Sequence, residues 1–488
     1  MATAHPPTSP TGGGGGDGAN VTRPGAPSRL RARWRQARSL IRLSPFDTGT
    51  PGGRSDERYR RIALTTLSSL ASRGVGAVVG LVTVPLVLGH LGKERFGLWS
   101  TITPLVAWVA IFDFGIANGL VNAISRAHGL DDEEEARRSV ATALVLLLGL
   151  AAAIVVLIAV AAPLVNWSSL LAVRGAVEEG TVRWSVVAAM ATFVVGMPLS
   201  IVPQVYAGYQ RAYVANACAL VGTLAGLAAL LLALHGGAGM PVLVVVLGVG
   251  GILSSAMGLA VIFVTMPWLR FRVSAVSRDS ARRLMSRSVP LFLFQLGALV
   301  VNETQSIVLA HRCDLSVVAD YAIVMRLYAL VVGLIQASTA SFVPSFREAS
   351  ERGETPWVRS AFTHFVRARL LLAMGAGFAL LLAGNVLLKW WLRRSDVAFG
   401  SASWIALAIL LVATTWVTAH SDLLAIMDTL WALVALVLVN GAVTLALTYA
   451  LAPRFQVLGA VLATATVTVL LYSWLVPWLV RVLYFQRS

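Results

Sequence analysis

The run Val140–Ala162 reads VATALVLLLGLAAAIVVLIAVAA and carries no charged side chain. About 20 consecutive apolar residues suffice for a helix to cross the roughly 30 Å hydrocarbon core of a bilayer. The rest of the chain agrees, because 57% of its 488 residues are hydrophobic, only 13% are charged and the mean hydropathy is +0.76. Soluble domains have about 25% charged residues. The sequence therefore predicts an all-α polytopic membrane protein.

Twelve apolar segments can be marked between Ile62 and Val480, and each is expected to be a transmembrane helix. The longest internal connection, 267–288, divides them six and six. The expected helices are 62–89, 96–120, 139–163, 184–206, 212–235, 240–266, 289–311, 316–345, 367–392, 403–427, 429–451 and 457–480.

Lys and Arg are concentrated in alternate gaps between these segments. Of the 39 basic residues, 28 fall in one set of gaps, which includes both termini, and 9 in the other set, with the helix-end residues Arg367, Arg369 and Lys389 counted in the neighbouring gaps. Arg73 and Arg326 lie well inside segments. Positive charge near helix ends is retained on the cytoplasmic side. We therefore expect twelve crossings with both termini in the cytoplasm. The net charge of +16 is explained by this topology and by anionic membrane lipids, and it needs no nucleic-acid partner.

Composition divides the chain into three predicted regions. Residues 1–58 are rich in Pro, Gly and Ser, with five glycines at 12–16, and are expected to be a disordered basic cytoplasmic tail. Within the tail, 29–42 is either a helix on the inner leaflet or a flexible basic stretch. Residues 59–271 and 272–488 are expected to hold six helices each.

The two halves contain similar runs at the same place. Pro85-Leu-Val-Leu-Gly-His90 resembles Ser306-Ile-Val-Leu-Ala-His311, and each run precedes a short polar loop and an aromatic helix start. With helices in the same order, this indicates a parallel repeat. Repeated bundles with a site at their interface are typical of secondary transporters.

The run Val84–Trp99, VPLVLGHLGKERFGLW, and the run Phe112–Leu120, FDFGIANGL, resemble the polysaccharide-export (Wzx-type) flippase family. The resemblance is strong over about 60–210 and rests mainly on topology beyond. The family belongs with MATE exporters and MurJ-like lipid flippases in one superfamily. The resemblance implies two six-helix bundles facing each other around a central cavity.

Two arginines inside apolar segments are the leading substrate-binding candidates, because a charge at mid-bilayer costs roughly 2.5 kcal/mol or more and marks function by default. Arg73 shares a helix face with two glycines, at 76 and 80, and its planar fork suits a pyrophosphate; the alternative is an ion pair with Asp113 or Glu303. Arg326 shares a helix face with Gly333 and Gln336. The alternative to substrate binding is that its side chain extends toward the outer membrane interface. MurJ-like flippases are similar in carrying cavity arginines on helices 1 and 8, which correspond to Arg73 and Arg326.

Buried carboxylates are the candidates for energy coupling. Asn302 and Glu303 form a polar group in an apolar helix, where the carboxylate either exchanges a proton or is permanently paired with an arginine. Asp113 lies in the resembling motif, where either a hydrogen-bonding role or coupling fits. Asp422 and His420 form a titratable pair or a structural one.

Two asparagines, Asn118 and Asn122, lie four residues apart on one helix face. Their amides can either bind sugar hydroxyls or join neighbouring helices. The two cysteines have no metal-ligand spacing, and no Walker, HExxH or GxSxG motif is present, so we expect neither a metal site nor an enzyme.

The expected function is to flip a polyprenyl-pyrophosphate-linked oligosaccharide across the bacterial cytoplasmic membrane for O-antigen, capsule or exopolysaccharide synthesis. No cofactor is expected beyond a coupling H⁺ or Na⁺. Expected partners are the lipid-linked glycan, membrane lipids, and a glycan polymerase or glycosyltransferases. Two alternatives stay open, a MATE-like exporter of small cations and a non-transporting scaffold of a glycan-synthesis complex.

Overall fold

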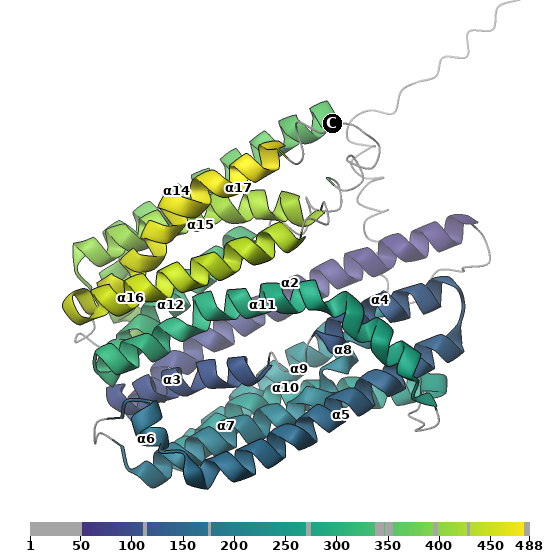
Figure 1. The fold of residues 1–488 in the computed structure, drawn as a ribbon, viewed down its shortest axis with the longest axis horizontal. Coiled ribbons are helices and arrows are strands. Elements are labelled where there is room, and N and C mark those ends of the chain that lie inside the picture. Colours follow the sequence, from purple (N-terminus) through teal and green to yellow (C-terminus); the bar gives the residue numbers. More distant parts are fainter. Residues whose placement is uncertain are drawn as a thin grey trace, which may run out of the picture. The chain divides into compact units, whose positions relative to one another are not determined.

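A computed structural model describes residues 51–110, 115–173, 177–269, 275–336, 346, 355–393, 399–426 and 430–482. These residues are almost entirely helical (Figure 1). The helices are α2 (Pro51–Leu91), α3 (Lys93–Ala110), α4 (Ile116–Gly129), α5 (Glu133–Leu164), α6 (Trp167–Leu170), α7 (Glu179–Leu199), α8 (Ile201–Gly208), α9 (Ala212–His235), α10 (Met240–Thr265), η2 (Pro267–Leu269), α11 (Arg278–Arg312), α12 (Leu315–Gln336), α14 (Thr355–Leu392), α15 (Ser401–Ile426), α16 (Leu430–Val467), η4 (Thr468–Tyr472) and α17 (Ser473–Val480).

Nine helical segments within the described ranges are long and apolar enough to cross a membrane, among them Ala63–Leu91, Glu133–Leu164 and Thr355–Leu392. Many of their large apolar side chains face outward, which is unfavourable in water; Leu232 and Leu382, for example, are at least 70% exposed. An apolar exterior is the expected state when lipid is the solvent. The protein is therefore a multi-pass membrane protein, whereas the number of twelve helices in two bundles stays a prediction.

The chain forms two compact units, residues 1–64 and residues 65–488. In the first unit the described part is the beginning of α2. There the Glu57 carboxylate accepts hydrogen bonds from Arg60 Nε at 2.7 Å and from Arg61 Nε at 2.9 Å. The predicted basic segment 29–42 lies outside the described residues.

Several helix boundaries differ from the sequence prediction, and one predicted break is present. The expected helix 96–120 is divided, because Gly115 has a φ of 72° and α4 starts only after it. The expected start of helix 7 at residue 289 is wrong, since α11 already begins at Arg278. Its charged first turns were assigned to a loop, but Leu284 packs with residues of α4 and α5, and Arg283 forms an ion pair with Glu135 of α5. The break expected near residue 456 is present within α16, where Gln456 has a φ of 51°.

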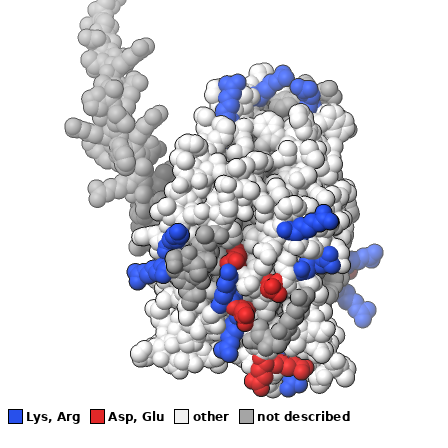
Figure 2. Space-filling view, turned by 90° about the vertical axis from the view of Figure 1, so that its left-hand side faces the viewer, with Lys and Arg blue, Asp and Glu red and all other residues white. Residues whose placement is uncertain are grey.

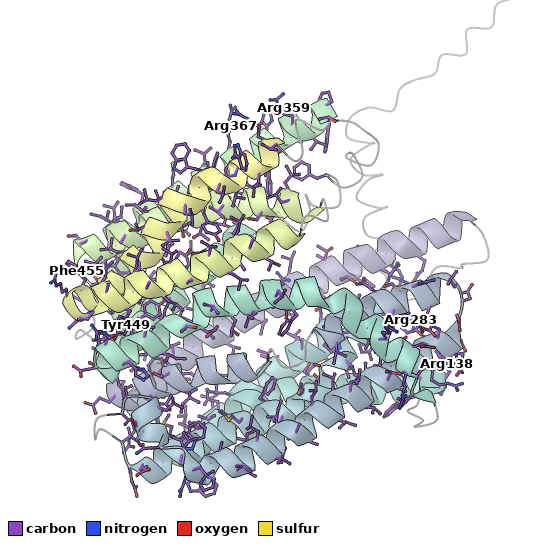
Figure 3. The ribbon with its side chains drawn as sticks, viewed as in Figure 1. Arg138, Arg283, Arg359, Arg367, Tyr449 and Phe455 are labelled. Atoms are coloured by element: carbon purple, nitrogen blue, oxygen red, sulfur yellow. The ribbon has the colours of Figure 1, made fainter. Side chains whose placement is uncertain are left out.

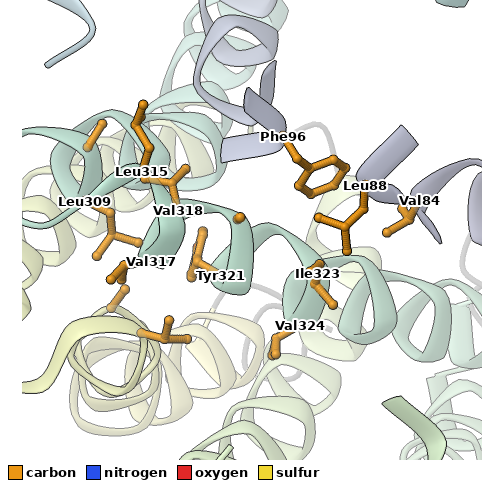
Figure 4. Packing of buried hydrophobic residues seen from close by; sticks show 14 of the residues in the cluster. Val84, Leu88, Phe96, Leu309, Leu315, Val317, Val318, Tyr321, Ile323 and Val324 are labelled. Atoms are coloured by element: carbon orange, nitrogen blue, oxygen red, sulfur yellow. The ribbon is translucent and has the colours of Figure 1, made fainter. Parts of the chain in front are cut away.

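The second unit has one buried apolar cluster that both halves of the sequence share. It joins Val84, Leu88 and Phe96 from α2 and α3 to residues of α11 and α12 such as Leu309 and Val324 (Figure 4). This cluster lies where α2 passes into α3 and α11 into α12, which we call the closed end. The two other clusters are separate: one contains α4, α5, α7, α8 and α10 with the first turns of α11, and the other contains α14 to α17 with Phe346.

A hydrogen bond between the halves ends on the C-terminal third of α2. Pro85 lies inside this helix and has no N–H, so the carbonyl of Leu81, four residues earlier, loses its helical partner. The indole Nε1 of Trp391, at the end of α14, donates to this carbonyl at 2.7 Å. In a hydrocarbon environment a freed backbone carbonyl needs such a partner.

This contact predicts a specific stability loss. Trp391→Phe leaves the Leu81 carbonyl unpaired and should lower the free energy of unfolding by about 1–3 kcal/mol, seen as a lower thermal midpoint in detergent. In a Pro85→Ala background, which restores the backbone donor, the same change should cost less. Trp390→Phe is the control, because that indole is 77% exposed. Equal losses from the two tryptophan substitutions would contradict the assignment.

Candidate functional site

The two arginines inside apolar helices meet along one face of α2: Arg73 belongs to this face, and the side chain of Arg326, from α12, lies against it. Arg73 and Gly80 are seven residues apart, so they share a helix face about 10 Å apart along the axis. A Cβ built on Gly80 would be 2.9 Å from Nη2 of Arg326, so the guanidinium of this α12 residue rests against the glycine backbone. A side chain at position 80 would displace the guanidinium from this place.

Space is open around both arginines. Arg73 and Arg326 are exposed, and a Cβ built on Gly76, between Arg73 and Gly80 on the strip, would meet no atom within 4 Å. The same is true of Gly333 on α12, where Gln336 is exposed on the continuing face. We call the α2 strip and this α12 face the arginine strip.

Neither arginine forms an ion pair with any described residue. The alternative of an Arg73–Glu303 pair therefore receives no support from the described contacts, whereas Asp113 lies outside the described residues. Two uncompensated guanidinium groups on a strip bordered by glycines can bind an anionic group, because phosphate oxygens accept the planar fork of N–H donors. They would repel a cation.

The closed end is held by backbone contact and by one ion pair. A Cβ built on Gly97 of α3 would clash with the backbone carbonyl of Leu315 on α12, so only glycine permits this approach. Beside it, Lys93 Nζ lies 2.9 Å from Asp320 Oδ2, with the two side chains 31% and 23% exposed. Figure 2 views the molecule from the left-hand side of Figure 1, and basic and acidic side chains are interspersed there on a mostly uncharged surface.

The candidate coupling residues lie apart from one another. Asp422 on α15 is paired with Arg369 of α14, whose Nη1 donates to Oδ2 at 3.0 Å and whose Nη2 donates to Thr418 at 3.1 Å. Arg369 is 1% exposed and its guanidinium also lies 5.2 Å from the ring centre of Phe365. The charge of Asp422 is thus compensated in this state.

His420 is buried next to this pair, where its Nδ1 lies 2.8 Å from the carbonyl of Trp416. Its ring also contacts those of Trp416 and Phe362, so it packs structurally in this state.

Glu303 on α11 is half-buried and forms no ion pair with a described residue. Two residues on, Gln305 donates from Nε2 to Thr464 at 2.7 Å and accepts from the Tyr321 hydroxyl at 3.2 Å. This polar network joins α11 to α12 and α16. Asn302 is part of α11, but its side chain lies outside the described set.

No described contact joins Asn118 or Asn122 of α4 to the arginine strip. Asn122 lines a polar pocket of about 250 Å³ together with Glu135 and Arg283, whose carboxylate and guanidinium form an ion pair at 2.8 Å. The side chain of Asn118 is outside the described set. A role for either residue in binding sugar stays a prediction.

Sequence reasoning missed Arg369, Lys93 and Asp320. Arg369 was counted as a helix-end charge, since the expected helix began at 367, whereas α14 begins at Thr355. Opposite charges near the same ends of two neighbouring helices, here with Asp422, were the available signal. The Lys93–Asp320 pair had no local signal, because the contact depends on how the halves meet.

The structure defines a class of protein. It is similar to the inward-facing conformation of a multidrug resistance MATE family transporter of the MOP superfamily, with a TM-score of 0.73 at 13% identity, covering 84% of this chain and 96% of that chain. An outward-facing conformation of a MATE family transporter gives a TM-score of 0.62 at 14% identity, covering 87% and 96%. The fold is thus that of a MATE-like membrane transporter.

The particular family follows from the sequence match. The model of the polysaccharide biosynthesis protein family matches residues 63–350, more than half of the chain, so this chain belongs to that family. The match confirms the resemblance to Wzx-type flippases. A putative O-antigen transporter of Salmonella typhi is 21% identical over 287 residues, which is 59% of this chain and 65% of that relative, just under two thirds of its length.

The Arg369–Asp422 pair predicts an asymmetric response to substitution. Asp422→Asn leaves a buried guanidinium without its carboxylate and should destabilise the protein by about 3–5 kcal/mol. Arg369→Gln leaves a carboxylate that is 34% exposed and should cost less. Thermal midpoints in detergent measure both, with the exposed Arg367→Gln as the control. A larger loss for Arg369→Gln would contradict the pairing.

Proposed function

We propose that this protein flips a polyprenyl-pyrophosphate-linked oligosaccharide from the inner to the outer leaflet of a bacterial cytoplasmic membrane, for the synthesis of a surface polysaccharide. The observation that carries the proposal is the arginine strip: two cations inside apolar helices, exposed and without an ion pair among the described residues. Membership of the polysaccharide biosynthesis family supports a glycan as the cargo.

The proposed cargo explains why cations are kept at this depth. Sugar hydroxyls and a pyrophosphate lose their hydrogen bonds to water in hydrocarbon, which costs several kcal/mol for each unpaired polar group. Arg73 and Arg326 supply charged donors to the pyrophosphate, and Gln336 adds an amide beside them. The polyprenyl chain needs no such replacement and stays in the bilayer.

The skew of Arg and Lys between alternate gaps supports an orientation with both termini in the cytoplasm. In this orientation the closed end, with Gly97 against Leu315, faces outward, and the ends with separate apolar clusters face the cytoplasm. The higher TM-score with an inward-facing transporter supports the same assignment. Such a state accepts cargo at the leaflet where it is synthesised.

The proposed energy source is a gradient of H⁺ or Na⁺ or the membrane potential, which supplies about 2.3 kcal/mol per charge per 100 mV. Glu303, Asp422, Asn302 and Asp113 are the proposed coupling residues. A glycan polymerase and glycosyltransferases are the proposed partners, because the lipid-linked glycan must be made before flipping and polymerised after it.

A second candidate function, the export of small molecules, is favoured by the MATE-like fold itself. A cationic drug would meet two arginines that have no ion pair among the described residues, which argues against drug export. A panel of drug susceptibilities on a deletion strain distinguishes the candidates, because an exporter's loss raises susceptibility while a flippase's loss removes surface glycan.

Substitution of the arginine strip tests the proposed function. Arg73→Ala and Arg326→Ala should each lower surface glycan by roughly tenfold or more, since a charge-assisted hydrogen bond contributes about 1.5–3 kcal/mol. Lysine at either position should restore part of the activity, because it keeps the positive charge but lacks the planar set of donors of the guanidinium group. Arg454→Ala, on an exposed residue, is the control. Full glycan levels with normally inserted protein would refute the role.

Substitution at the closed end tests the proposed alternation. Gly97→Ala cannot keep the contact with Leu315 and should shift the population toward an outward-open state. The probe is the exposed Ala329, as A329C in a background with both native cysteines replaced by serine, labelled with a membrane-impermeant maleimide from outside. Labelling should rise with Gly97→Ala but not with the control Gly89→Ala, whose new Cβ meets no atom within 4 Å. Unchanged labelling would oppose this state assignment.

A further inference from the structure

A long apolar groove lies in the C-terminal half, away from the arginine strip. Its floor is α15 and its walls are α14 and α17, each of which packs against α15. The groove has a volume of about 1530 Å³. This exceeds the roughly 300–1,000 Å³ of an ordinary small-molecule pocket, so it fits a longer ligand.

The sequence builds this groove with small residues and a disturbed helix. Gly377 lets α14 approach Ala408 of α15, since a Cβ there would be 3.2 Å from the alanine Cβ. The wall formed by α17 follows the wide turn η4, where Ser473 Oγ donates to the carbonyl of Thr468 at 3.0 Å. The floor residue Trp416 donates from Nε1 to the carbonyl of Ser473 at 2.9 Å, which fixes this wall.

Charge is present at one end of the groove. Arg359 lies at the beginning of α14 and Arg481 at the end of α17, and both line the groove together with Trp478. Figure 3 shows Arg359 at the end of the second unit opposite to Tyr449 and Phe455. No acidic residue lines the groove within the described part of the chain. An apolar channel with two guanidinium groups at its mouth matches a lipid with a phosphate head.

The length of the groove decides which lipid fits. On α14 the lining extends from Arg359 to Leu381, which corresponds to about 33 Å of helix. A phospholipid occupies one leaflet, or about 20–22 Å with its headgroup, half of the bilayer's total thickness. A single chain that continues past the midplane fits the remaining length better than two acyl chains that end there.

We propose that this groove is a docking site for a polyprenyl phosphate, with the isoprenoid chain along α15 and the phosphate between Arg359 and Arg481. The proposal rests on the proposed function and deepens it, because the same carrier lipid anchors the glycan. The groove holds the carrier lipid in the cytoplasmic leaflet before flipping, and the phosphate leaves Arg359 and Arg481 when the headgroup moves to the arginine strip.

The test uses the full-length protein in phosphatidylethanolamine liposomes with a C55 polyprenyl phosphate that bears a diazirine near its phosphate end. Photo-adducts are mapped by mass spectrometry and should concentrate on peptides of α14, α15 and α17. Ile409→Trp fills the groove and should lower these adducts roughly tenfold. Ile405→Trp is the matched control, because both isoleucines lie on α15 and are 49% and 50% exposed, but only Ile409 lines the groove.

The double variant Arg359→Ala/Arg481→Ala should require a higher mole fraction of the probe for the same labelling. Unlabelled polyprenyl phosphate should compete, while phosphatidylglycerol at the same mole fraction should not. Adducts spread evenly over lipid-facing helices such as α9, equal competition by phosphatidylglycerol, or equal labelling of the two tryptophan variants would each overturn the inference.

A flipping measurement in the same liposomes separates this inference from the proposed function. If the wild type flips a lipid-linked oligosaccharide and Ile409→Trp flips and labels normally, the groove assignment fails and the function stands. If the wild type labels in the groove but flips nothing, the function fails and the docking site stands.

Discussion

Hydrocarbon offers no hydrogen-bond partner, so each polar group inside this protein must be satisfied by protein, by water or by cargo. The Leu81 carbonyl, freed by Pro85, is satisfied by Trp391 from the other half of the chain. The two Nη atoms of Arg369 donate hydrogen bonds to Asp422 and Thr418. Arg73 and Arg326 differ, since they face open space beside glycines. This difference separates the arginine that is paired within the protein from the two that we propose to bind the cargo.

The same constraint explains how the halves are joined. Where α3 meets α12, the contact is apolar and close, and it depends on Gly97 having no side chain. The neighbouring Lys93–Asp320 pair is partly exposed, and such a pair contributes only about 0–1 kcal/mol. A contact dominated by apolar surface and weak charge pairing can separate without leaving a buried charge unpaired. A buried pair such as Arg369–Asp422 could not, and it lies within the C-terminal half.

Local signals predicted much of this structure and none of the contacts between distant helices. Uninterrupted apolar runs located the spans, and the break before residue 457 was visible from Pro453 and Arg454. The division at Gly115 was missed, because one glycine in an apolar run does not reveal a positive φ. Arg73 and Arg326 were found because a charge inside an apolar run is conspicuous. Arg369 was not, because its helix extends beyond its apolar portion.

In the function that we propose, the groove and the arginine strip each serve one part of an amphipathic cargo. A lipid-linked glycan is amphipathic, and a single site cannot be both wet enough for sugars and apolar enough for a long isoprenoid chain. The hydrated part needs charges without an ion pair, and neither Arg73 nor Arg326 has one among the described residues. The apolar part needs length and small floor residues, which α15 supplies at Ala408 and Ala413. Because the tail never has to leave hydrocarbon, its site needs no replacement for water, whereas the site of the headgroup does.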